Sequence, residues 1–395
     1  MSLLLLGGLK EDSGAIADST YWNTLEVNPV VGSIKSLSIL LIAPLLVTFL
    51  IIIERSKRIP IIPTLAVQAI LFSSIIATVG SVVEMGLSGF SNLIVFIITF
   101  ATYVTIGSAA LNSSTGEVMR GIYHGILGFS VSMIGLNLFI YVTGYGFVPG
   151  MPRMFGTTVH PNFLGVQMAI CLVTCLHAFL SGRRLMRVAM LAALASGLII
   201  LFNSGSRTGF IMLGIGGTFA YWARSGYSLR STFALGVLGT LFIFFLVAAA
   251  TSDVTDTPFD RGTGAADNNT RAVVWAEMIN LIADSPWIGQ GHPVGPSENS
   301  LLRGWVAYGI GYVISLVVAL FSLVAALFRE ATAYREGPLF LGLGVALIIG
   351  SMLEGYLVDR FSGPLVLFIL ISCVAAFAPH QMQKHTHMAR HGWIS

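Results

Sequence analysis

The sequence predicts an all-α polytopic membrane protein. The chain has 395 residues, of which 55% are hydrophobic and only 10% are charged, whereas average soluble domains carry about 25% charged residues. The mean hydropathy is +0.83. Apolar runs of nearly 20 residues, the length that crosses a bilayer as a helix, recur along the chain.

These runs predict about eleven transmembrane helices. In chain order they fall at residues 36–53, 61–79, 92–110, 121–143, 162–180, 188–204, 208–223, 231–250, 301–328, 338–358 and 363–379. Residues 1–9 are apolar but too short to span, and no basic stretch precedes them as it would in a signal peptide. Because no repeat or separate soluble segment is visible, we expect residues 1–395 to form a single membrane domain.

The distribution of Lys and Arg predicts the orientation. If the N-terminus lies outside, the inner segments contain thirteen of the 21 cations and the outer segments contain eight. Cytoplasmic loops are enriched in such residues, so the N-terminus is expected outside and the C-terminus in the cytoplasm.

The longest predicted connection, residues 251–300, joins spans eight and nine on the outer side. Its first part is polar and rich in Gly, Asp and Asn, as an irregular loop would be. Val274, Met278 and Ile282 then recur at helical spacing. We expect a short amphipathic helix at about residues 270–284, lying at the outer membrane surface.

Charge and cysteine content exclude several classes of partner. The net charge is only +3, which does not indicate nucleic-acid binding, and the three cysteines lie in apolar runs. Neither a Walker phosphate loop nor a two-metal carboxylate cluster is visible. We therefore expect no metal and no cofactor.

The sharpest candidate for a functional group is Arg207, which follows Ser206 between two short apolar runs. This places a guanidinium at or just below the outer lipid headgroups, where its planar donors match a phosphate or pyrophosphate. The alternative is an arginine that reaches ordinary lipid phosphates.

A second polar cluster, Arg153, His160 and Asn162, precedes span five, and Pro161 stands where a helix would begin. His160 could carry a proton or contact a phosphate, because the pKa of histidine lies near neutrality. Alternatively, His160 simply caps or braces the loop.

The third cluster lies in the long outer loop and at the start of span nine. Arg271 shares a helix face with Trp275, four residues on. Glu298 stands beside the start of a span, where partial burial would make it a useful base, with His292 as a weaker alternative. Alternatively, Glu298 only caps the helix. The predicted substrate-binding set comprises Arg153, His160, Asn162, Ser206, Trp275, His292, Asn299 and Arg303.

Taken in order, these motifs resemble the O-antigen ligase/polymerase superfamily, which includes exopolysaccharide polymerases. The matching features extend over roughly residues 140–330. They are His160-Pro161-Asn162, Ser206-Arg207-x-Gly209, Arg271-x-x-x-Trp275, Pro286-Trp287-Ile288-Gly289-x-Gly291, Glu298-Asn299-Ser300-Leu301 and Gly309-Ile310-Gly311.

The resemblance implies a membrane glycosyltransferase of the GT-C type that takes a glycan from an undecaprenyl-pyrophosphate carrier. It places the reaction at the periplasmic face of the bacterial inner membrane and implies a flippase and a chain-length regulator as partners. Arginines matching Arg207 and Arg271 would hold the pyrophosphate. One departure is that ligases usually show a His-Asn pair where this chain has Glu298-Asn299.

The favoured function is therefore polymerisation of repeat units, with Arg207 and Arg271 clamping the diphosphate and Glu298 as the base. The alternatives are a ligase that attaches the glycan to lipid A core or another acceptor, a transporter or flippase for lipid-linked oligosaccharides, and a structural membrane partner. Glu84 and Glu354, which border spans on the outer side, are weaker candidates with a possible structural role.

Overall fold

The computed structural model describes residues 63–113, 115–144, 146–147, 153–158, 160–228, 270–294, 298–358 and 362–390. The predicted spans at 36–53 and 231–250 lie outside these residues. Each of the other predicted spans overlaps a helix, but the predicted span 338–358 runs seven residues past the helix, which ends at Ser351. The helices are α4 (Leu65–Met85), η2 (Gly86–Asn92), α5 (Leu93–Asn112), α6 (Thr115–Val142), α7 (Pro161–Ser181), α8 (Arg184–Ser204), α9 (Arg207–Arg224), α11 (Thr270–Asp284), α12 (Ser300–Glu330), α13 (Gly337–Ser351) and α14 (Gly363–Arg390).

The all-α membrane class is confirmed. Six helical segments are long and apolar enough to cross a bilayer, namely Leu65–Phe90, α5, α6, α7, α8 and α12. Two shorter apolar helices are α13 and the Gly363–Phe377 part of α14. Within the described ranges there is no strand, and Phe147 and Met154 form only an isolated bridge.

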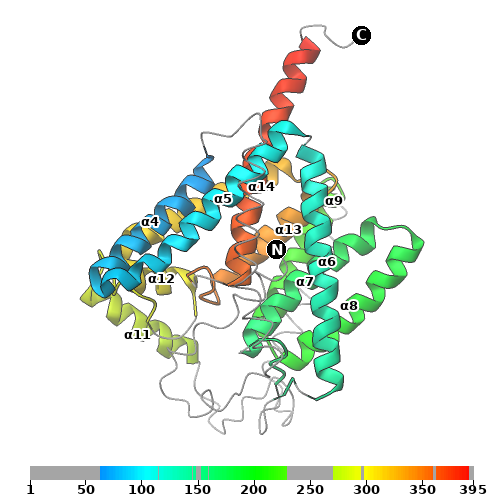
Figure 1. The fold of residues 1–395 in the computed structure, drawn as a ribbon. Helices are drawn as coiled ribbons and strands as arrows, with labels where there is room; N and C mark the ends of the chain where they lie inside the picture. The colour runs from blue at the N-terminus through cyan, green and yellow to red at the C-terminus, as the bar shows by residue number, and fades with distance from the viewer. Residues whose placement is uncertain are drawn as a thin grey trace.

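The helices form two packed groups (Figure 1). On one side α4, α5, α11 and α12 lie together, and on the other side α7 packs against α6, α8 and α9. Helices α13 and α14 lie between the groups, because α13 contacts both α9 and α12, and α14 contacts α5 and α12 of one group and α6 and α7 of the other.

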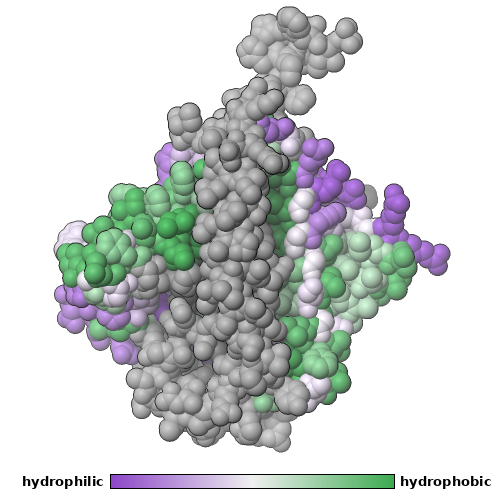
Figure 2. All heavy atoms as spheres, in the orientation of Figure 1, coloured by the Kyte–Doolittle hydropathy of each residue, from purple (hydrophilic) through white to green (hydrophobic). Residues whose placement is uncertain are grey.

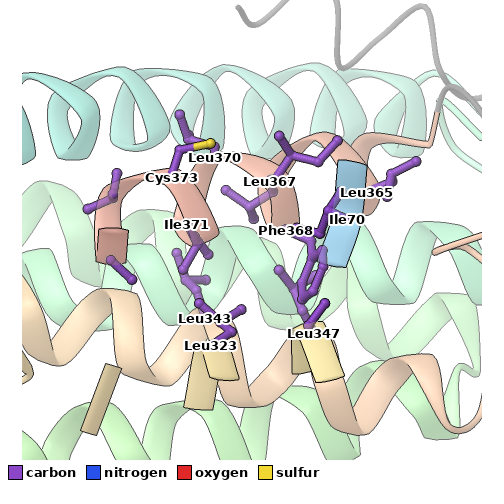
Figure 3. Close-up of a cluster of buried hydrophobic side chains, with 14 of the residues drawn as sticks. Ile70, Leu323, Leu343, Leu347, Leu365, Leu367, Phe368, Leu370, Ile371 and Cys373 are labelled. Atoms are coloured by element: carbon purple, nitrogen blue, oxygen red, sulfur yellow. The ribbon is translucent and has the colours of Figure 1, made fainter. Parts of the chain in front are cut away.

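The main core is formed where α14 is surrounded by its neighbours. Leucine, isoleucine and phenylalanine side chains of α14 meet Ile70 of α4, Leu323 of α12 and Leu343 and Leu347 of α13 (Figure 3). From Leu367 to Phe377 every residue of α14 is buried. Burial around the whole circumference is expected for a helix enclosed by other helices, where no polar face is needed.

Exposed hydrophobic side chains lie on the outer faces of α4, α5, α6 and α8, and Figure 2 shows green surface over α4 and α5 on one side and over α8 on the other. They include Phe72, Phe100, Phe139 and Leu191, which are 58%, 48%, 63% and 58% exposed. Apolar surface of this extent on several adjacent helices is typical of contact with lipid.

One end of the bundle collects most of the polar connections, and we call it the polar end. It comprises residues 146–158, 203–208, 285–304 and 352–358 among those described. The opposite end carries the α7–α8 turn, which is hydrophilic in Figure 2 and contains the exposed Arg183 and Arg184. There Arg224 and Arg335 donate to Ser181, at 2.6 Å to its hydroxyl and 3.2 Å to its backbone oxygen respectively.

Candidate functional site

Arg207 is the first residue of α9 at the polar end. The helix begins here because Ser206 caps it, its hydroxyl accepting from the backbone N–H of Gly209 at 3.1 Å. Arg207 itself is partly buried, while Ser206 and Thr208 on either side are fully enclosed. The sequence therefore places a single guanidinium at a helix start, where the helix dipole also favours an anion.

The first turn of α9 lies directly against α7. A Cβ on Gly209 would stand 2.6 Å from the backbone oxygen of Gly165, and a Cβ on Gly165 would overlap Ser206. Glycine at both positions thus lets the two backbones touch. This close contact fixes Arg207 relative to the start of α7.

The start of α7 is built by the second predicted cluster. Pro161 occupies the first helical position, and Nδ1 of His160 accepts from the backbone N–H of Asn162 at 3.1 Å. Arg153 donates through Nε to the backbone oxygen of Ser204 and through Nη2 to Oδ1 of Asn162, both at 2.8 Å. His160 is therefore a helix cap, as in the alternative prediction. Arg153 connects the start of α7 to the end of α8.

The start of α12 carries the third cluster. Asn299, rather than Glu298, caps the helix, because its Oδ1 accepts from the backbone N–H groups of Leu301 and Leu302 at 3.0 and 3.2 Å. The alternative of Glu298 as the cap is therefore wrong. Glu298 is partly buried just before the helix, and Arg303 is fully buried in its first turn. Burial of both charges in a protein interior is costly unless they are compensated.

Glu354, only a weak candidate in the sequence, joins the starts of α9 and α12. Its Oε1 accepts from the Thr208 hydroxyl at 2.9 Å, and its backbone oxygen accepts from the Ser300 hydroxyl at 2.8 Å. The side chains of Thr208, Ser300 and Glu354 are all buried. Arg207 directly precedes Thr208, and Glu298 stands two residues before Ser300. The two hydrogen bonds therefore bring Arg207 and Glu298 to the same part of the polar end.

Helix α11 packs against the start of α12 through its apolar face. Met278 and Ile282 are buried with Val306 of α12, and Trp305 is partly buried against them. Trp275 lies one turn earlier and is partly buried. The backbone of Arg271 belongs to the first turn of α11, whereas its side chain lies outside the described part of the chain.

The Pro-Trp-Ile-Gly-x-Gly motif has a structural role at a break in α12. Gly309 has φ 77° and ψ −178°, which interrupts the helix. In a regular helix the backbone oxygens of Val306 and Ala307 would accept from the backbone N–H groups of residues 310 and 311. Instead they accept from the backbone N–H groups of Gln290 and Gly291, both at 2.8 Å.

The turn at residues 286–291 also accepts hydrogen bonds from α12 at the break. The backbone N–H of Ile310 donates to the oxygen of Pro286 at 3.1 Å, and Nε1 of Trp305 donates to that oxygen at 2.9 Å. The turn is also attached to α4, because the Ser81 hydroxyl donates to the oxygen of Gly291. His292, just beyond it, is exposed, with Nδ1 at 2.8 Å from the oxygen of Gln290.

The structure thus gathers most of the predicted site residues at one end of the bundle. Arg153, His160, Asn162 and Ser206 surround the α7–α9 contact, and Glu298, Asn299 and Arg303 form the start of α12. His292 and Trp275 belong to the neighbouring α11 segment.

Residues 190–312 match the O-antigen ligase family model. The resemblance to the O-antigen ligase/polymerase superfamily is therefore confirmed. No curated protein compared with the chain matches it significantly. Arg207, Arg271, Glu298 and the Gly309 break lie inside the matched stretch of the O-antigen ligase family, whereas His160 and Glu354 lie outside it.

The match to the O-antigen ligase family model, together with the long apolar helices, indicates an integral membrane protein with a function of the O-antigen ligase or polymerase type. It also indicates a lipid-linked glycan as the substrate.

Proposed function

We propose that the chain polymerises undecaprenyl-pyrophosphate-linked oligosaccharide repeat units into an exopolysaccharide or O-antigen at the periplasmic face of the bacterial inner membrane. An acceptor hydroxyl oxygen forms a bond to the anomeric carbon of the donor sugar. The bond from that carbon to the pyrophosphate oxygen breaks, and undecaprenyl pyrophosphate leaves with the electron pair. The acceptor proton passes to a carboxylate of the protein.

The observation that carries this proposal is the joining of two first helical turns, both inside the family-matched stretch. Arg207 begins α9 and Glu298 precedes α12, and Glu354 is hydrogen-bonded to both turns. A cation and a carboxylate at the same end of the bundle suit glycosyl transfer from a diphosphate, which needs charge stabilisation of the leaving group and a base for the acceptor.

Each group then has a definite role. Arg207 and Arg271 clamp the pyrophosphate, because a guanidinium presents a planar set of donors to phosphate oxygens. Glu298 takes the acceptor proton. The residues that contact the sugars and phosphates come from the set Arg153, His160, Asn162, Ser206, Trp275, His292, Asn299 and Arg303. In this scheme the positive charge is supplied by arginine and not by a metal, so transfer should persist in EDTA.

Polymerase activity is preferred over ligase activity on two sequence features. Glu298-Asn299 stands where ligases usually have His-Asn, and His160-Pro161-Asn162 is like the exopolysaccharide polymerases. A flippase and a chain-length regulator are the expected partners, and the N-terminus would be periplasmic and the C-terminus cytoplasmic. The second candidate, a ligase to lipid A core or another acceptor, uses the same groups on a different acceptor.

The test is complementation of a deletion strain, with lipid-linked and surface glycans separated by size. Wild-type chain should restore polymer, whereas Arg207→Ala, Arg271→Ala and Glu298→Gln should not. Arg184→Ala, at the exposed α7–α8 turn of the opposite end, is the matched control and should restore polymer fully. Full polymer from Arg207→Ala or Arg271→Ala protein that is folded and membrane-inserted would contradict the proposed site.

The deletion strain itself distinguishes the candidate functions. Single repeat units that accumulate on the carrier indicate a polymerase. Long carrier-linked chains that never reach their final acceptor indicate a ligase. Repeat units that stay on the cytoplasmic side indicate a flippase, and the proposed enzyme activity would then be wrong.

A further inference from the structure

Glu354 is a carboxylate buried inside the polar end, between α13 and α14. Its side chain is only 3% exposed. Its own turn is fixed, since its backbone N–H donates to the oxygen of Gly350 at 2.8 Å. Tyr356, two residues on, is completely buried, and this burial together with the nearby charge of Glu354 raises the pKa of the tyrosine well above its ordinary value. A carboxylate in such a place requires a structural or functional reason.

The contacts of Glu354 reach two helices that are distant in the sequence. The side chain accepts from the Thr208 hydroxyl at 2.9 Å, which ties it to the first turn of α9. The backbone oxygen accepts from the Ser300 hydroxyl at 2.8 Å, and the same hydroxyl accepts from the backbone N–H of Leu357 at 3.2 Å. Ser300 is the first residue of α12.

We infer that Glu354 is a positioning residue, which through Thr208 and Ser300 holds Arg207 and Glu298 at the spacing that glycosyl transfer needs. The inference rests on the proposed function. Thr208 is the neighbour of Arg207 along the chain, and Ser300 follows Glu298 by two residues. A shift of either helix start by about 1 Å would lower the rate by as much as about 100-fold.

This role predicts a change in turnover and not in donor affinity. The pyrophosphate would still be held by Arg207 and Arg271 after the link is cut. What the enzyme would lose is the alignment of the bound donor with the base. A link that served only the packing of α9 and α12 would instead lower stability and leave the turnover of the folded fraction unchanged.

The experiment compares Thr208→Val with Thr174→Val in purified protein. Both threonines are buried, but Thr174 donates only within its own helix, to the oxygen of Ile170 at 2.9 Å. Initial rates are measured against the concentration of the lipid-linked repeat unit extracted from the deletion strain. We expect Thr208→Val to lower kcat at least about 10-fold with KM changed less than about 3-fold. Thr174→Val should leave both constants near wild type.

Conservative variants test the hydrogen bond itself. Thr208→Ser restores the donor and should recover kcat to within about 3-fold of wild type. Glu354→Gln keeps an amide oxygen for the Thr208 hydroxyl and should stay similarly active, whereas Glu354→Ala should resemble Thr208→Val. These three variants decide the inference if Thr208→Val does not fold.

The outcomes separate the inference from the proposed function. If Arg207→Ala is inactive while folded Thr208→Val and Glu354→Ala turn over like wild type, the positioning role is wrong and the function stands. If Glu354→Gln is as inactive as Glu354→Ala, the charge and not the hydrogen bond matters, which also overturns it. If Arg207→Ala and Glu298→Gln both retain full kcat, the proposed function and this inference are both wrong.

Discussion

Nε of Arg153 lies 2.8 Å from the backbone oxygen of Ser204. Because Nη2 of the same side chain reaches Asn162, one guanidinium ties the end of α8 to the start of α7. The α8–α9 turn that carries Arg207 follows Ser204 directly. Arg153, which the sequence predicts to bind substrate, thus also holds together the helix ends next to Arg207.

Arg153→Lys should destabilise the protein although it keeps the charge. Lysine presents a single ammonium and cannot reproduce the planar fork that serves both acceptors. Losing one charged hydrogen bond of this kind costs about 1.5–3 kcal/mol. The check is the melting temperature in detergent. Arg184→Lys, at an exposed position, is the control. A melting temperature equal to wild type would show that the brace contributes little.

Gly309→Ala should be strongly destabilising. At φ 77° a side chain is strained by about 1–3 kcal/mol, and the added Cβ would also overlap the backbone oxygen of Trp287. Gly125→Ala is the control, because Gly125 lies in α6 with open space around its Cβ position. Thermal unfolding of both variants in detergent checks this expectation, which would fail if the two melted alike.

Asn299→Val should destabilise the start of α12 more than Asn299→Gly. The residue has φ 51°, where a β-branched side chain is strongly disfavoured and glycine is not. Glycine in place of a capping asparagine costs only a few tenths of a kcal/mol. The expected order of melting temperatures is therefore wild type, then Asn299→Gly, then Asn299→Val. The reverse order of the two variants would contradict the backbone geometry.

Cysteine labelling should reveal the orientation of the bundle. Cys171, Cys175 and Cys373 are all 0% exposed, so the native background should be low. His292→Cys, at the polar end, should react with a membrane-impermeant maleimide in spheroplasts. Arg184→Cys, at the opposite end, should react only after lysis. Labelling in the opposite pattern would reverse the proposed orientation and exclude a periplasmic site.

The helices were predictable because they follow from hydrophobic transfer alone. Runs such as 121–143 and 162–180 are apolar for about the length of a bilayer, and the structure has α6 and α7 there. The sequence indicates that the helices begin with capping residues, but not always which residue is the cap. An acceptor side chain is preferred before α12. Glu298 and Asn299 both carry such an oxygen, and the structure shows that the shorter Asn299 is the cap.

The long-range contacts were not predictable from local patterns. Glu354 bonds to a residue 146 positions away and to another 54 positions away, and no periodicity encodes such pairs. The break at Gly309 is similar, because a glycine inside an apolar run is compatible with a regular helix. The glycines of the 286–291 turn signal a tight bend, but their pairing with α12 depends on packing.

The substituted hydrogen bonds at Gly309 have a consequence for how the chain is assembled in its membrane. The break lies nine residues into α12, about 14 Å along its axis from the first residue. Lipid offers no water to solvate bare carbonyls, so a span with this gap would enter a bilayer poorly by itself. Residues 286–291 precede α12 in the chain and leave the ribosome earlier. The groups that fill the gap are therefore synthesised before the helix that needs them.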